Sequence, residues 1–101
     1  MSGLAVRETD GLWEARLAKE LEPAVRVHTD AAEPGDVLLL TADTVAAWLD
    51  EPVDDRLRPR GVLLIADESD PLWASAGVSA VFPTTASAGR VAESVRRLLE
   101  Y

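Results

Sequence analysis

Two continuous apolar runs of strand length constrain the fold of this chain most strongly. Val37-Leu-Leu-Leu-Thr41 and Val62-Leu-Leu-Ile-Ala66 show no alternation of polar and apolar residues. A strand has this pattern when both of its faces are covered, as in the centre of a parallel sheet. These two runs therefore predict a parallel sheet with helices packed on both sides.

Three further segments complete a set of five predicted strands. Leu4–Glu8 is the first, Val25–Thr29 alternates with a period of two, and Val78–Phe82 is ended by a proline. Most of the intervening stretches carry helix signals. The longest of these is predicted over Asp10–Glu22, where an acidic cap precedes apolar residues repeated at helical spacing. Three later helices are expected: one after Asp43 or Thr44, one between Asp70-Pro71 and Gly77, and one that starts near Ser87 and buries Val91, Val95 and Leu98.

The connection between the second and third predicted strands leaves no room for a helix. Six residues separate Thr29 from Asp36, and seven residue steps reach at most about 25 Å. Returning along a strand of about five residues and crossing one neighbour needs about 20 Å, so an extended linker just spans the gap. The element order β-α-β-β-α-β-α-β-α predicts an α/β domain with a parallel sheet. Linkers are expected at Asp30–Gly35 and Glu51–Gly61.

Composition excludes several classes of function. A chain of 101 residues suits a single domain over positions 1–101. Its net charge of −8 disfavours direct nucleic-acid binding by this segment. Without cysteine and with one histidine, thiolate chemistry and a histidine-built metal or catalytic site are not expected. No apolar run approaches the roughly 20 residues that cross a bilayer, and no signal peptide is recognisable. We therefore expect a cytoplasmic domain with no membrane segment, no cofactor and no enzymatic activity.

Four segments together resemble the receiver domains of bacterial response regulators, especially those of the NarL/LuxR type. Gly77–Glu100 resembles the fifth strand and last helix of that family, Asp36–Thr41 its third strand, and Val62–Asp67 its fourth. Leu4–Leu21 is similar to the first strand and helix. The resemblance implies a flavodoxin-like receiver fold, with strand order 2-1-3-4-5 and helices on both faces. The second helix of the family would be missing here.

The residues that carry phosphorylation chemistry in that family have changed in this chain. The family uses two acids to hold Mg²⁺, an aspartate to accept the phosphoryl group, and a hydroxyl and a lysine to read the new charge. A hydroxyl cannot replace the carboxylate in forming an acyl phosphate, and a threonine cannot pair with a phosphoryl group as a lysine does. The aligned positions are Glu8 and Thr9 for the acid pair, Thr41 for the acceptor, Ala66 for the hydroxyl, Thr84 for the lysine and Val81 for the aromatic switch.

The resemblance therefore implies a pseudo-receiver that works without phosphorylation. Such a module would regulate or dimerise an attached output domain, by resemblance a helix-turn-helix transcriptional regulator, and residues 1–101 would suit the N-terminal part of a longer regulator. One alternative is a localisation domain like the atypical receiver domains of pilus-assembly or septum-site ATPases. Another is a sensor domain that binds a small ligand over Thr41, Ala66 and Thr84.

Acidic residues are also expected at the carboxyl edge of the sheet, where α/β proteins bind ligands. They would form a residual hard-cation site, but helix capping and loop solvation account for them more simply, so we predict no metal site. They are Glu8, Asp10, Asp43, Asp67 and Glu68.

The missing helix predicts a partner surface. Leu38 and Leu40 share one face of the third strand, Val37 and Leu39 share the other, and part of one apolar face would lose its cover. We expect this face, or the surface of the last helix, to mediate homodimerisation or docking of a partner domain. The tryptophans are expected in the core, and His28, on an edge strand, is expected to be exposed or hydrogen-bonded without a functional role.

Overall fold

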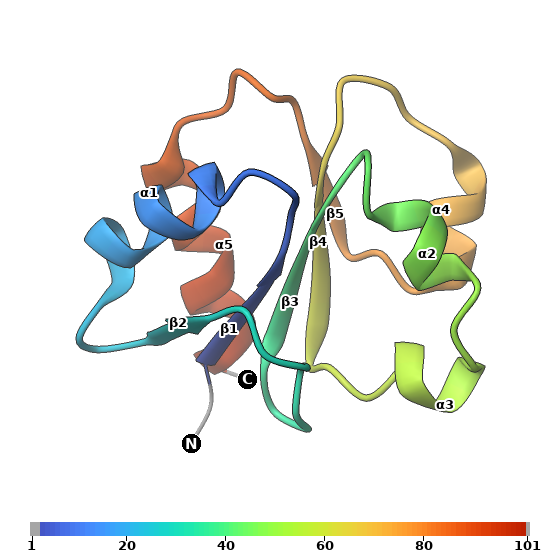
Figure 1. Ribbon diagram of the computed structural model, residues 1–101, viewed down its shortest axis with the longest axis horizontal. Coiled ribbons are helices and arrows are strands. Elements are labelled where there is room, and N and C mark those ends of the chain that lie inside the picture. Colours follow the sequence, from blue (N-terminus) through green and yellow to red (C-terminus); the bar gives the residue numbers. More distant parts are fainter. Residues whose placement is uncertain (1–2, 101) are drawn as a thin grey trace.

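A computed structural model of the protein describes residues 3–100 and contains one five-stranded, all-parallel sheet. The strand order is β2-β1-β3-β4-β5 (Figure 1). The elements are β1 (Gly3–Arg7), α1 (Leu12–Leu21), β2 (Arg26–His28), β3 (Val37–Thr41), α2 (Val45–Leu49), α3 (Val53–Arg56), β4 (Gly61–Ile65), α4 (Pro71–Ala76), β5 (Ala80–Phe82) and α5 (Ala88–Glu100).

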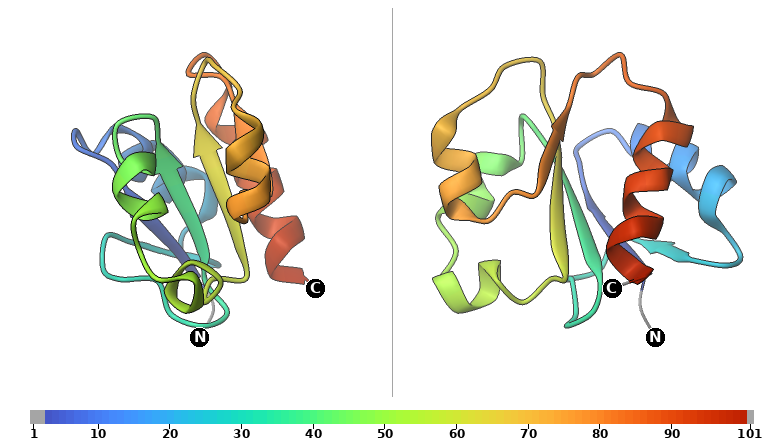
Figure 2. Two further views of the ribbon diagram at one scale, coloured as in Figure 1. Left: turned by 90° about the vertical axis from the view of Figure 1, so that its right-hand side faces the viewer. Right: turned by 180° about the vertical axis from the view of Figure 1, so that it is seen from behind.

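Helices cover both faces of this sheet. Helices α1 and α5 pack on one side, and α2 and α4 lie on the other (Figure 1, Figure 2). Order 2-1-3-4-5 with two helical layers is the flavodoxin-like, doubly wound topology. The predicted fold class is confirmed, including the missing helix, since no helix lies between β2 and β3 in the described chain.

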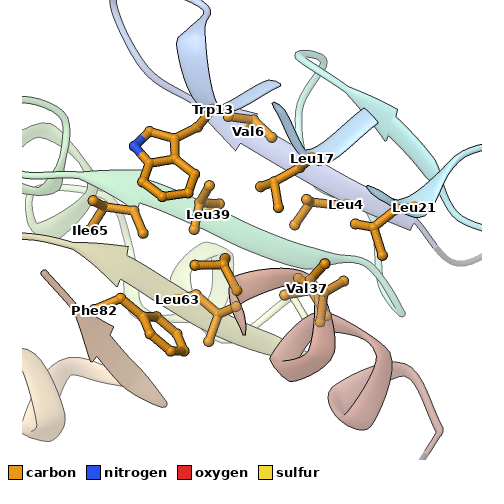
Figure 3. Packing of buried hydrophobic residues seen from close by; sticks show 13 residues of the cluster. Leu4, Val6, Trp13, Leu17, Leu21, Val37, Leu39, Leu63, Ile65 and Phe82 are labelled. Carbon is orange, nitrogen blue, oxygen red and sulfur yellow. The ribbon is translucent and has the colours of Figure 1, made fainter. Parts of the chain in front are cut away.

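The larger core lies between the sheet and the α1–α5 layer. Leu39 and Leu63 from the central strands meet Trp13 and Leu17 of α1 there, and all four side chains are at least nine-tenths buried (Figure 3). Full burial of a side chain of this size stabilises the fold by about 1.5–3 kcal/mol. The continuous apolar runs are therefore explained by strands that are covered on both sides.

The opposite face of the sheet is also covered, so the predicted uncovered apolar face is wrong. Leu38 and Leu40 are fully buried, with no more than 1 % of their surface exposed. Trp48 of α2 fills the space above them and is itself fully buried, while Ala32 of the β2–β3 connection packs at the margin. A large aromatic side chain and a short loop thus cover the part of the sheet that the missing helix would have covered.

The β2–β3 connection is less stretched than predicted. Strand β2 has three residues, not five, and Val27 and Val37 pair with the same residue of β1, Leu4. The chain therefore has little distance to cover along the strands, and a turn fits in which the Asp36 amide donates to the Glu33 carbonyl at 3.0 Å.

A buried contact between a histidine and a carboxylate closes this connection. His28 Nε2 lies 3.1 Å from Asp36 Oδ2, with the two side chains 10 % and 4 % exposed. The Asp36 carboxylate also accepts from the backbone amides of Gly3, at 2.8 Å, and Glu33, at 3.1 Å. Of the two environments expected for His28, exposed or hydrogen-bonded, the structure shows the second. The Asp36 carboxylate links the starts of β1 and β3 to the end of β2.

The helix predictions need two corrections. Helix α1 starts at Leu12, not Asp10, because Gly11 precedes it in the left-handed region at φ 75°. The expected linker at Glu51–Gly61 contains the short helix α3, whose Asp54 and Asp55 lie in the first turn and are favoured by the helix dipole.

The other helices follow the prediction closely. Asp70 caps α4 by accepting from the Leu72 amide, and Gly77 ends α4 at φ 118°. In α5, Val91 and Val95 are fully buried as expected. Strand β5 starts two residues later than predicted, because the amide of Val78 still donates back to the Trp73 carbonyl at the end of α4.

Candidate functional site

A cavity of about 540 Å³ lies at the carboxyl edge of the sheet. Parallel strands end together at this edge, and the topology brings the loops after β1, β3 and β5 to it. It gathers four of the predicted pocket residues, and we call it the carboxyl-edge cavity. Its lining residues are Glu8, Thr9, Asp10, Leu12, Trp13, Arg16, Thr41, Ala42, Asp43, Ile65 and Thr84.

Glu8, the one acid retained at the predicted magnesium-binding pair, caps a helix. Its Oε1 accepts from the Trp13 amide at 2.8 Å, and its Oε2 accepts from the Glu14 amide at 2.7 Å. Both amides belong to the first turn of α1, whose N–H groups have no partner within the helix. The carboxylate therefore stabilises the start of α1, and both of its oxygens already have donors.

Thr41, at the predicted acceptor position, belongs to a hydroxyl–carboxylate cluster. Its Oγ1 donates to Asp43 Oδ1, and Thr9 Oγ1 donates to Asp43 Oδ2 at 2.6 Å. The hydroxyls of Thr41 and Thr9 hold the pKa of Asp43 below its ordinary value of 3.8. The start of α2 was expected after Asp43 or Thr44, with capping by such a residue, but the Asp43 side chain does not cap this helix. Thr44 precedes α2 but its Oγ1 accepts from the Thr41 amide, at 2.9 Å, and donates to the Arg7 carbonyl, at 3.0 Å.

Thr84, at the predicted lysine position, bonds to the loop after β4. Its backbone amide and its hydroxyl each donate to the Asp67 carboxylate at 3.0 Å. Asp67 thus links the ends of β4 and β5 across the edge. The three threonines at altered positions thus donate to neighbouring carboxylates, and their bonds account for two of the edge acids, Asp43 and Asp67.

Two of the predicted positions lie outside the carboxyl-edge cavity. Ala66 is buried beneath the α2–α4 layer, and its amide extends the β4–β5 ladder by donating to the Phe82 carbonyl at 2.8 Å. Val81, at the predicted switch position, is 38 % exposed in the edge strand β5.

Helix α1 supplies a wall of the cavity that the sequence reasoning missed. Trp13 was predicted only as a core residue, and Arg16 was not considered. The Arg16 guanidinium lies 5.4 Å from the centre of the Trp13 ring. Helix α1 therefore provides a cation at this cavity, whereas β5 is followed by Thr84 at the predicted lysine position. The signal was the three-residue spacing, which places both side chains on one helix face.

Among residues 3–100, no group of three or more histidines, cysteines and acids is arranged to hold a metal ion. None of the helices there is long and apolar enough to cross a membrane. Comparison with models of protein families, with curated proteins and with solved structures finds no match to this chain.

Proposed function

We propose that this chain is a phosphorylation-independent, receiver-like module of the cytoplasm that regulates or dimerises an attached output domain. The resemblance identified from sequence makes a helix-turn-helix transcriptional regulator the expected output domain. The supporting observation is the arrangement around Thr41, where a hydroxyl bound to Asp43 occupies the position that would accept a phosphoryl group. A second support is Thr84, which bonds Asp67 where a lysine would read the phosphoryl charge.

Treatment of the chain with acetyl phosphate and Mg²⁺ tests this proposal directly. We expect intact-protein mass spectrometry to find no phosphoryl adduct, because no carboxylate ends β3. A conventional receiver domain, treated in the same way, provides the positive control. A hydroxylamine-sensitive adduct on any aspartate of this chain would overturn the proposal.

We place the dimer contact on the layer formed by α2, α3 and α4. A groove of about 600 Å³ is lined there mainly by apolar side chains of α2 and α4, among them Leu49 and Leu72. Leu72 is 56 % exposed. Asp50 and Arg56 line the same groove. We infer that Asp50 of each copy pairs with Arg56 of the other in a two-fold dimer, which would make this surface complementary to itself.

Sedimentation velocity over a range of protein concentrations tests the dimer contact. We expect reversible dimerisation that weakens at least about tenfold in Leu72→Ser, a loss of about 1.4 kcal/mol. Leu12→Ser is the matched control, because Leu12 is 47 % exposed in the first turn of α1, on the other side of the sheet. A chain that stays monomeric at all concentrations, or equal weakening by both variants, would refute this contact.

The carboxyl-edge cavity favours a second function, the sensing of a small ligand. Its volume of about 540 Å³ falls within the roughly 300–1,000 Å³ of small-molecule sites. A sensor of this kind would bind its ligand where a conventional receiver is phosphorylated.

A further inference from the structure

An indole donor in the carboxyl-edge cavity has no protein acceptor. Trp13 is 6 % exposed, and its ring packs over Leu39 and Ile65 (Figure 3). Its nitrogen lies on the side of the ring away from Leu17, toward the end of β4 that carries Ile65 (Figure 3). No hydrogen bond of Trp13 Nε1 is found within residues 3–100, and this nitrogen is not sealed off in the core. The Trp13 N–H is therefore a donor that a ligand in the cavity can reach.

Arg16 places a cation beside this donor. The guanidinium stacks on the Trp13 ring, and no carboxylate of the described chain lies within ion-pair distance of it. The α1 wall therefore presents donors only, and these match the planar, two-oxygen geometry of a carboxylate.

The rest of the charged lining is acidic. Glu8, Asp10 and Asp43 line the cavity from the ends of β1 and β3. Their oxygens bond amides and hydroxyls, but those neutral donors leave the negative charges in place. Three carboxylates and one guanidinium line the cavity, so a ligand with a net negative charge would be repelled. A simple cation would leave the Trp13 donor and Arg16 without a partner.

We propose that the carboxyl-edge cavity binds a small zwitterion of the α-amino-acid class. The ligand carboxylate bonds Trp13 Nε1 and Arg16, and the ligand ammonium lies toward Asp10 and Asp43. This inference deepens the proposed function, on which it rests in one respect: the edge must be free of a phosphoryl group. The cavity lining carries both acidic groups and the Arg16 guanidinium, which favours a ligand with both charges over one with either alone.

Nitrogen-15 NMR of the indole N–H signals tests the proposal. The loss of one signal in Trp13→Phe assigns the Trp13 resonance. Each of the common L-α-amino acids is then titrated separately to about 10 mM, ten times a Kd of about 1 mM. We expect at least one to shift the Trp13 signal saturably. Its N-acetyl and carboxamide derivatives, which each lack one charge, should bind at least about tenfold more weakly, which is about 1.4 kcal/mol.

Two variants test the walls separately. Arg16→Gln and Asp10→Asn should each weaken binding at least about tenfold, whereas Lys19→Gln, on the same helix but outside the cavity, should leave it unchanged. The inference is overturned if no amino acid shifts the signal, if the derivatives bind equally well, or if Lys19→Gln weakens binding as much as Arg16→Gln. The acetyl phosphate experiment is independent, so failure here without a phosphoryl adduct leaves the proposed function standing.

Discussion

Replacing Asp36 with alanine should destabilise this fold more than any surface substitution. The carboxylate is buried, and it receives donors from Gly3, Glu33 and His28 at 2.8–3.1 Å. A hydrogen bond to a charged group contributes about 1.5–3 kcal/mol when buried. The Gly3 bond is buried and the other two are partly buried, so we expect a total loss of about 4 kcal/mol. That is a large share of the roughly 5–15 kcal/mol that stabilise a domain.

Urea unfolding followed by tryptophan fluorescence measures this loss. With a slope of about 2 kcal/mol per molar urea, the midpoint should fall by about 2 M. Asp30→Ala is the matched control, because Asp30 lies in the same connection but forms only an exposed pair with Arg26 at 3.6 Å. That variant should change stability by less than about 1 kcal/mol. If both variants unfold at the same urea concentration, the argument for a structural carboxylate fails.

The same comparison has a defined pH dependence. Burial alone would raise the pKa of Asp36, but the hydrogen bonds from Glu33, Gly3 and His28 outweigh burial, so the net pKa lies below its ordinary value of 3.8. A lowered folded-state pKa means that the carboxylate stabilises the fold above the unfolded pKa. This stabilisation is lost as the pH falls through the folded pKa. The difference between the natural chain and Asp36→Ala should therefore be full near neutral pH and narrow below about pH 3.8.

Of three further substitutions, two should lower the stability of the fold and one should raise it. Glu8→Ala removes the cap of α1 and should cost about 1 kcal/mol, measured by urea unfolding; an unchanged midpoint would contradict the capping role. Gly3→Ala would place a Cβ 2.7 Å from the Arg26 carbonyl oxygen in the neighbouring strand, so it should lower stability by about 1–3 kcal/mol. A variant as stable as the natural chain would show that β2 moves aside to accommodate the Cβ. Gly89→Ala, in helix α5 with no atom closer than 3.9 Å to the new Cβ, should raise the thermal midpoint through a gain of about 0.5 kcal/mol, and a decrease would refute this.

The fold was predictable because its central strands carry a strong local signal. Residues Val37–Leu40 and Val62–Ala66 are apolar throughout, as expected for strands between two helical layers. The limits of α4 were equally clear, since Asp70 and Gly77 act through side-chain and backbone properties that need no distant partner.

The candidate site was predictable in position but not in contacts. Glu8 reaches the start of α1 only because Gly11 turns the chain back toward it. The pairing of His28 with Asp36 depends on the register of β2 and β3 against β1, which no local pattern encodes. The sequence did not predict that both faces of the sheet are covered, for a related reason. Trp48, which comes from a different part of the chain, fills the volume that the absent helix would have filled.

The two outermost strands limit how this protein can assemble. Both β2 and β5 have three residues, so each offers few free backbone amides and carbonyls to another chain. Short margins of this kind oppose lateral fusion of two sheets into one larger sheet. Assemblies of this protein should therefore form through side chains of its helical layers, a mode that single residues can strengthen, weaken or redirect without disturbing the sheet.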